Sequence, residues 1–125
     1  MSVSVPISFG ELWDKYTILL IKQNKIKDET KLNFVILEIK LLDELMNNFL
    51  YNENELFINL YDINQKLWDI EDKIRIKEKN KSFDNEFIEL ARSVYYKNDI
   101  RAEIKKQINI LFDSNIHEVK YYVNY

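Results

Sequence analysis

Two groups of carboxylates in this sequence stand at helical spacing and could hold a divalent metal. Glu11 and Asp14 are one helical turn apart near the N-terminus, while Asp69, Glu71 and Asp72 gather in the middle of the chain. Carboxylate oxygens are the ligands that Mg²⁺ and Mn²⁺ prefer. If Glu11, Asp14, Glu71 and Asp72 converged, they could bind either metal for chemistry on a phosphate.

A second set of polar and aromatic side chains recurs at steps of three and four residues. On the segment 84–112, Asn98 and Arg101 interrupt an apolar line between Val94 and Ile104, where a helix core normally carries apolar residues. We call the whole set the polar cluster: Asn64, Trp68, Asp69, Glu71, Asp72, Arg75, Arg92, Tyr95, Asn98, Asp99 and Arg101. Polar layers in helical bundles often set the register between helices, and we favour that role over catalysis.

Counting outward from the turn near Ser82 predicts which members of the polar cluster meet. At about 1.5 Å of rise per residue, two antiparallel helices place Glu71 level with Arg92, and Asn64 level with the stretch from Asn98 to Arg101. Trp68 comes level with Tyr95 or Tyr96 by the same count. We therefore predict an ion pair between Glu71 and Arg92.

Composition bounds the class of protein. The 125 residues are 46% hydrophobic and 31% charged, the balance of one folded domain, residues 1–125. There is no cysteine, and His117 is the one histidine, which disfavours zinc, iron–sulfur and haem sites. A net charge of -3 disfavours an extended nucleic-acid surface. The first residues resemble no export signal and no segment is apolar for 18 residues, so we expect a cytoplasmic protein without a membrane contact.

The breakers of secondary structure stand near the N-terminus, which favours long helices elsewhere. Pro6 and Gly10 are the only residues of their kinds. Ser8 is placed to cap a helix, and apolar periodicity predicts helices over about 9–28, 31–50, 54–80 and 84–112. With short turns between them, these helices predict an all-α, antiparallel, up-down four-helix bundle.

The two chain ends carry a different period. Val3 and Val5 alternate with polar residues, as do Val119, Tyr121 and Val123. Alternation of this kind is typical of a strand, so the termini could pair as a short β-ribbon. The alternative is that both ends are extended and loosely held, because an isolated two-stranded ribbon is marginal in water.

The helix at 31–50 is apolar over most of its circumference. One line of apolar residues includes Val35 and Ile39, and a second line is formed by Phe34, Leu37, Leu41 and Leu45. Such a helix is either buried on several sides or packed against another subunit. The last five residues include Tyr121, Tyr122 and Tyr125, and aromatic residues are enriched where proteins meet. Both features favour a homo-oligomer or contact with another protein.

Three segments together resemble a known family. They are PISFGELWDKYTILLIK, NQKLWDIEDKIRIKE and FIELARSVYYKNDIRAEIKKQIN, and they are similar to the bacterial and phage family called domain of unknown function 6165. The resemblance covers most of the chain. It implies no activity, cofactor or substrate.

Two functions from different classes remain open. The first is a non-enzymatic helical interaction or assembly module that self-associates and needs no cofactor. The second is a hydrolase of nucleotides or phosphate esters that uses Mg²⁺ or Mn²⁺. All-alpha nucleotide pyrophosphohydrolases use Glu-x-x-Asp pairs, and Glu11 and Asp14 have that spacing, while Arg75, Arg92 and Arg101 could bind phosphate. The deciding feature is whether several carboxylates face one cleft.

Overall fold

The computed structural model describes residues 1–125 and consists of helices joined by short turns, with no strand. The helices are α1 (Phe9–Lys25), α2 (Glu29–Asn47), α3 (Glu55–Lys79) and α4 (Asn85–Leu111), with one 3-10 turn, η1 (Tyr51–Glu53), between α2 and α3. The predicted all-α bundle of four helices is confirmed.

The helix boundaries differ from those predicted chiefly at the turn between α1 and α2. The predicted helix 9–28 ends at Lys25, because Ile26 is extended and Asp28 starts the next helix by accepting the amide hydrogen of Lys31. The predicted helix 31–50 begins at Glu29 and ends at Asn47, and Leu50 then turns the chain with a left-handed backbone (φ 49°).

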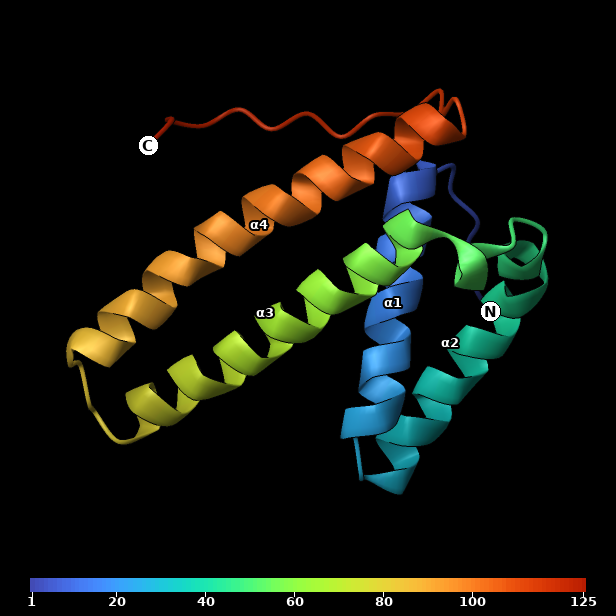
Figure 1. Ribbon diagram of the computed structural model, residues 1–125. Coiled ribbons are helices and arrows are strands. Elements are labelled where there is room, and N and C mark those ends of the chain that lie inside the picture. Colours follow the sequence, from blue (N-terminus) through green and yellow to red (C-terminus); the bar gives the residue numbers. More distant parts are fainter.

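The four helices form two antiparallel hairpins that cross one another (Figure 1). Helix α1 contacts α2, α3 and α4, whereas α2 makes extensive contact with α1 alone. The α3–α4 hairpin is long, and its half nearest the α3–α4 turn extends beyond α1. Helix α1 is therefore the common support of both hairpins, and one side of α2 is left without a helical partner.

The sequence explains the length and the starts of these helices. No glycine or proline follows Gly10, so α3 and α4 run for 25 and 27 residues without interruption. Each helix starts at a side chain that accepts an amide hydrogen of the first turn: Ser8, Asp28, Asn54 and Asp84. No helix is both long and apolar enough to cross a lipid bilayer.

The core lies where α1 packs against the other helices. Trp13, Met46, Leu60 and Ile108 come from four different helices and are all fully buried. Aromatic rings extend this core toward the start of α1, where Phe9 stacks on Phe112 at a centroid distance of 4.8 Å. Burial of these side chains supplies most of the stabilisation, at about 1.5–3 kcal/mol for each fully buried large apolar residue.

Gly10 sets the distance between α1 and α4. A β-carbon at this position would lie 2.7 Å from the carbonyl oxygen of Lys105 and 3.0 Å from Asn109 Oδ1. The amide of Gly10 donates a hydrogen bond of 2.7 Å to Asn109 Oδ1. The two backbones can approach this closely only because residue 10 has no side chain.

The β-ribbon between the chain ends is not formed. Residues 1–7 lie beside α2, whereas residues 114–125 run back along α4 in an extended conformation (Figure 1). Side chains of the tail bind α4 instead, through Glu118 on Lys105 and through Tyr122 and Tyr125 on Asp99. These contacts hold the tail away from the N-terminal segment.

We predict that Gly10→Ala destabilises the fold by about 1–3 kcal/mol, because the added methyl group forces α1 away from the Lys105 carbonyl. Urea unfolding followed by circular dichroism measures the change. Lys106→Ala, at an exposed position of α4, is the control and should change stability by no more than about 0.5 kcal/mol. Equal stability of Gly10→Ala and the wild type would contradict the close packing described here.

Candidate functional site

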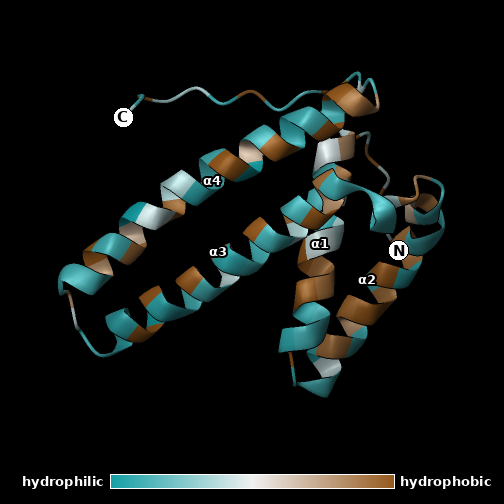
Figure 2. Ribbon diagram, viewed as in Figure 1, coloured by the Kyte–Doolittle hydropathy of each residue, from teal (hydrophilic) through white to brown (hydrophobic).

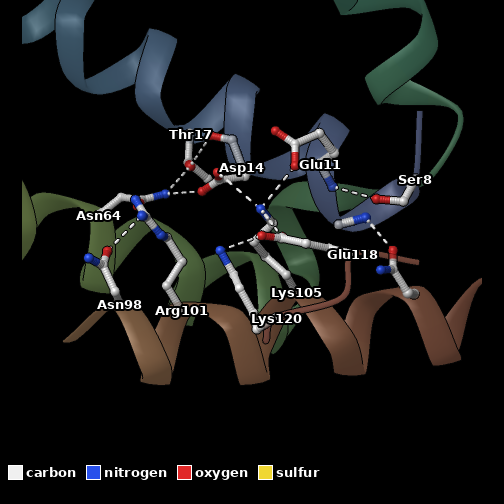
Figure 3. Close-up of polar contacts among 12 residues, drawn as sticks. Ser8, Glu11, Asp14, Thr17, Asn64, Asn98, Arg101, Lys105, Glu118 and Lys120 are labelled. Atoms are coloured by element: carbon white, nitrogen blue, oxygen red, sulfur yellow. Dashed lines mark hydrogen bonds and ion pairs between the residues drawn. The ribbon is translucent and has the colours of Figure 1, made fainter. Parts of the chain in front are cut away.

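A buried polar layer crosses the interface of α1, α3 and α4 (Figure 3). Asn64, on α3, lies at its centre. The amide nitrogen of Asn64 donates to Asp14 Oδ1 and to the Thr17 hydroxyl, each at 2.8 Å, and all three residues are buried. The hydroxyl of Thr17 donates in turn to the backbone carbonyl of Asp14 at 2.7 Å. The Asn64 side chain is thus held with its carbonyl oxygen toward α4.

That carbonyl oxygen accepts a hydrogen bond from Arg101. Arg101 Nη1 donates to Asn64 Oδ1 at 3.2 Å, and Nη2 donates to Asn98 Oδ1, one turn earlier on α4, at 2.6 Å. The predicted level of Asn64 with Asn98 and Arg101 is confirmed. Both polar residues in the apolar line of α4 are therefore paired.

Lys105 forms the second half of the layer. Its ammonium group lies 2.8 Å from Glu118, 3.0 Å from Glu11 and 3.6 Å from Asp14, and its side chain is 9% exposed. Burial alone lowers the pKa of Lys105, but the hydrogen bonds to Glu118 and Glu11 outweigh burial and raise the pKa above the ordinary lysine value. Lys105 is therefore a fixed positive charge that joins α1, α4 and the tail.

The C-terminal tail is attached to α4 at two places. Glu118 contacts Lys105 and Lys120, and hydrogen bonds from these two ammonium groups lower the pKa of Glu118 to about 2. Farther along, the hydroxyls of Tyr122 and Tyr125 donate to the carboxylate of Asp99. The hydrogen bond to Asp99 is the main reason that the pKa of Tyr125 rises to about 12.

A groove opens beside the Asn64–Arg101 contact, between α3 and α4. Its cavity volume is about 520 Å³. It is lined by ten residues: Ile18, Asn64, Leu67, Trp68, Glu71, Asp72, Arg75, Val94, Asn98 and Arg101. Seven of these belong to the predicted polar cluster, so the structure brings most of that cluster to one groove.

The remaining members of the polar cluster lie elsewhere. Asp69 faces α1 and lies 3.6 Å from Lys25. Tyr95 packs against Tyr125 of the tail at a centroid distance of 5.0 Å, and Asp99 binds the tail tyrosines. The predicted cluster is therefore divided between the groove, the tail contact and the surface.

The predicted ion pair between Glu71 and Arg92 is wrong. Arg92 pairs with Glu89 at 3.2 Å on its own helix, and Glu71 approaches Arg75 at 3.9 Å on its own helix. Exposed charges gain little from a particular distant partner, and neighbours at i+3 or i+4 need less ordering of the side chain.

The four carboxylates proposed as metal ligands do not form one group. Glu11 and Asp14 contact Lys105, while Glu71 and Asp72 line the groove. The structure contains no set of three or more histidine, cysteine or acidic side chains arranged to hold a metal ion. The four carboxylates are therefore divided between the polar layer and the groove.

The sequence interpretation missed the residues that complete the polar layer. Thr17, Lys105, Asn109 and Glu118 were not selected, and Gly10 was noted only as a helix breaker. One signal was present: Arg101, Lys105 and Asn109 follow one another at steps of four and thus share one face of α4. Lysine is frequent in this chain, so Lys105 did not stand out from the other lysines.

Comparisons with known proteins find no match among family models, curated proteins or solved structures. The resemblance to domain of unknown function 6165 stays a prediction.

We predict that Asn64→Ala costs about 2–4 kcal/mol of stability, because it removes the donor to Asp14 and Thr17 and the acceptor for Arg101 inside a buried layer. Chemical denaturation measures this loss. Lys66→Ala removes an exposed i,i+4 ion pair on the same helix and should cost less than about 0.5 kcal/mol. A cost for Asn64→Ala as small as that of Lys66→Ala would contradict a structural role for the layer.

We predict that the Glu118–Lys105 contact stabilises the fold above about pH 4.5. Folding depresses the pKa of Glu118 to about 2, so its contribution is complete above the unfolded-state pKa and is lost as the pH falls through the folded-state value. Glu118→Gln should lower the free energy of unfolding at pH 7 on the order of 1 kcal/mol, given the partial exposure of Glu118. This difference should shrink as the pH falls toward 3.

Urea titrations of both proteins between pH 3 and pH 7 provide the measurement. Glu103→Gln, an exposed change on α4, is the matched control and should track the wild type at every pH. A Glu118→Gln deficit that stays constant down to pH 3 would show that the charge on Glu118 is not responsible.

Proposed function

We propose that this protein is a non-enzymatic helical assembly module that self-associates through the outer face of α2. The observation that carries the proposal is a line of large apolar side chains on the side of α2 that faces away from α1. Phe34 and Leu41 are 70% and 68% exposed, and Leu37 and Leu45 are also exposed. Figure 2 draws α2 as largely apolar, although it makes extensive contact with α1 alone.

The spacing of these residues suits a two-fold symmetric contact. Phe34, Leu37, Leu41 and Leu45 follow one another at steps of three, four and four, which keeps them on one helical stripe. In an antiparallel pair of α2 helices, Phe34 lies within one residue of the position opposite the partner's Leu45 when Leu37 lies opposite the partner's Leu41. A surface that is nearly complementary to itself is what a symmetric dimer requires.

The apolar area is large enough for such a contact. Next to Leu45, the N-terminal segment adds Val3, Val5 and Ile7, which line a groove together with Leu42 and Phe49. From their exposures, the stripe and this segment present roughly 700 Å² of apolar side chain, close to the ~800 Å² that each partner buries in a standard interface. Monomers rarely expose a contiguous apolar patch larger than ~600 Å².

The aromatic tail supports self-association less well than α2 does. Tyr122 and Tyr125 are engaged with Asp99, Tyr95 and Tyr96 of the same chain. Tyr121, at 98% exposed, is the one tail tyrosine free of such contacts. We therefore assign the interface to α2.

Leu41→Glu is predicted to convert a dimer into a monomer, because it places a carboxylate at the centre of the stripe. Removing this charge from water in a dimer interface would cost a large free energy. Sedimentation equilibrium at micromolar concentrations measures the mass. The wild-type protein should have twice the mass of one chain, and the variant should have the mass of one chain while its circular dichroism is unchanged.

Ile88→Glu is the matched control. Ile88 is also an exposed aliphatic residue, at 50%, but it lies on α4, near the α3–α4 turn and away from α2. This variant should remain a dimer. A wild-type protein that is monomeric up to about 100 µM would overturn self-association, since specific homodimers with interfaces of standard size persist below that concentration.

A further inference from the structure

The groove between α3 and α4 is lined by a guanidinium, that of Arg101, whose hydrogen-bond donors are not all used within the chain. Arg101 lines the groove and is half-buried. Its hydrogen bonds go to the carbonyl oxygens of Asn64 and Asn98, which are both neutral. A guanidinium has five N–H donors, so N–H groups of Arg101 remain for a further acceptor.

The neighbouring cation on α4, Lys105, has carboxylate partners within the chain. Lys105, one turn after Arg101, meets three carboxylates, from Glu11, Asp14 and Glu118. Arg101 forms no ion pair, although it is also partly withdrawn from water. Asn64 is held by Asp14 and Thr17 and so fixes the guanidinium in place. A fixed, partly desolvated guanidinium is a suitable seat for a planar carboxylate, which it can bind through two parallel hydrogen bonds.

The wall of the groove beside Arg101 is apolar and aromatic. Trp68 lies one turn after Asn64 on α3, and it lines the groove with Ile18, Leu67 and Val94. Trp68 is half-buried, so part of the indole is available to a ligand, and a flat apolar group gains from contact with such a ring. The groove thus offers an anion seat and an aromatic surface side by side.

The acidic residues of the groove select among anions. Glu71 and Asp72 line it seven and eight residues beyond Asn64, which is about 11 Å along α3. A dianion such as a phosphate monoester is repelled twice as strongly as a monoanion by Glu71 and Asp72 and attracted twice as strongly by Arg101 and Arg75, which also lines the groove. Because the cost of desolvating an ion rises with the square of its charge, the balance in this groove favours a ligand with one negative charge. From this arrangement we propose that the groove binds a small monocarboxylate with an aromatic or apolar body, its carboxylate on Arg101 and its body against Trp68. This site is independent of the contact made by α2.

The indole N–H signals in a ¹⁵N–¹H NMR spectrum of the full chain test the proposal. There are two tryptophans, of which Trp13 is fully buried and Trp68 lies in the groove. Trp68→Phe assigns the two signals.

Benzoate should move the Trp68 signal in a saturable manner and leave the Trp13 signal in place. Phenyl phosphate, which has the same ring and a dianionic group, should bind more weakly. No shift of Trp68 with benzoate up to about 10 mM, which corresponds to less than about 3 kcal/mol of binding, would overturn the site.

Substitutions separate Arg101 from the rest of the groove. Arg101→Gln should weaken benzoate binding about tenfold or more, because it removes a charge-assisted pair of hydrogen bonds. Arg92→Gln is the matched control, since Arg92 is exposed on the same helix and lies outside the groove, and it should bind benzoate as the wild type does. Equal binding by Arg101→Gln and Arg92→Gln would overturn the assignment of Arg101.

The position of the Trp13 signal reports whether Arg101→Gln is folded. Asp72→Asn tests the selectivity between the two anions, and it provides a second test of the groove if Arg101→Gln does not fold. Asp72 is exposed, so the variant should fold. Removing its charge should strengthen phenyl phosphate binding about threefold and change benzoate binding less, since the repulsion of a dianion is roughly twice that of a monoanion. Tighter binding of phenyl phosphate than of benzoate by the wild type, or no change in Asp72→Asn, would overturn the preference for a monocarboxylate.

Discussion

The arrangement of all four helices depends on how closely α1 approaches α4 at Gly10. At this crossing, the backbone amide of Gly10 binds Asn109, and the carbonyl of Lys105 occupies the space where any other residue would carry a β-carbon. The same turns of helix bring the ammonium of Lys105 to Glu11 and Asp14. A slip of α1 along α4 would separate these charges inside a partly dry interface, where an unpaired charge costs several kcal/mol. Steric and electrostatic requirements therefore select the same register.

This crossing explains why two surfaces of the molecule remain open. Because α1 alone supports both hairpins, α2 is covered on the side that carries Val35 and Ile39 and bare on the side that carries Phe34 and Leu41. The outer half of the α3–α4 hairpin passes beyond α1 (Figure 1) and leaves the groove at Trp68 accessible. In a bundle with four parallel axes, α2 would pack against a second helix and lose its bare side. The apolar stripe and the groove are thus two consequences of one packing geometry.

Local sequence signals predicted most of the helical structure, and tertiary contacts decided the rest. The apolar periodicity, together with the absence of glycine and proline after Gly10, predicted two helices of more than 20 residues. Equal counting from the α3–α4 turn placed Asn64 level with the stretch from Asn98 to Arg101, where it contacts Arg101. The same counting failed for Glu71 and Arg92, because exposed charges accept partners on their own helix. The alternation at the termini suggested a ribbon, but a long-range contact that alternation does not encode, between Glu118 and Lys105, draws the tail along α4.

Two cations lie one turn apart on α4, and the chain provides carboxylates for only one of them: Lys105 has three, and Arg101 has none. This difference connects the polar layer to the groove. A polar layer in a helical interface is less stable than an apolar one, and the loss is smallest when every charge in the layer has a partner of opposite charge. Lys105 meets that condition, since its three carboxylates come from α1 and the tail. Arg101 does not, because Asn64 stands between it and Asp14 and offers only a neutral carbonyl. An aspartate at position 64 would give Arg101 an ion-pair partner within the chain, but it would also place a carboxylate against Asp14, which now accepts from the Asn64 amide. The asparagine at that position leaves Arg101 without an anionic partner in the chain, so its positive charge remains available to a ligand in the groove.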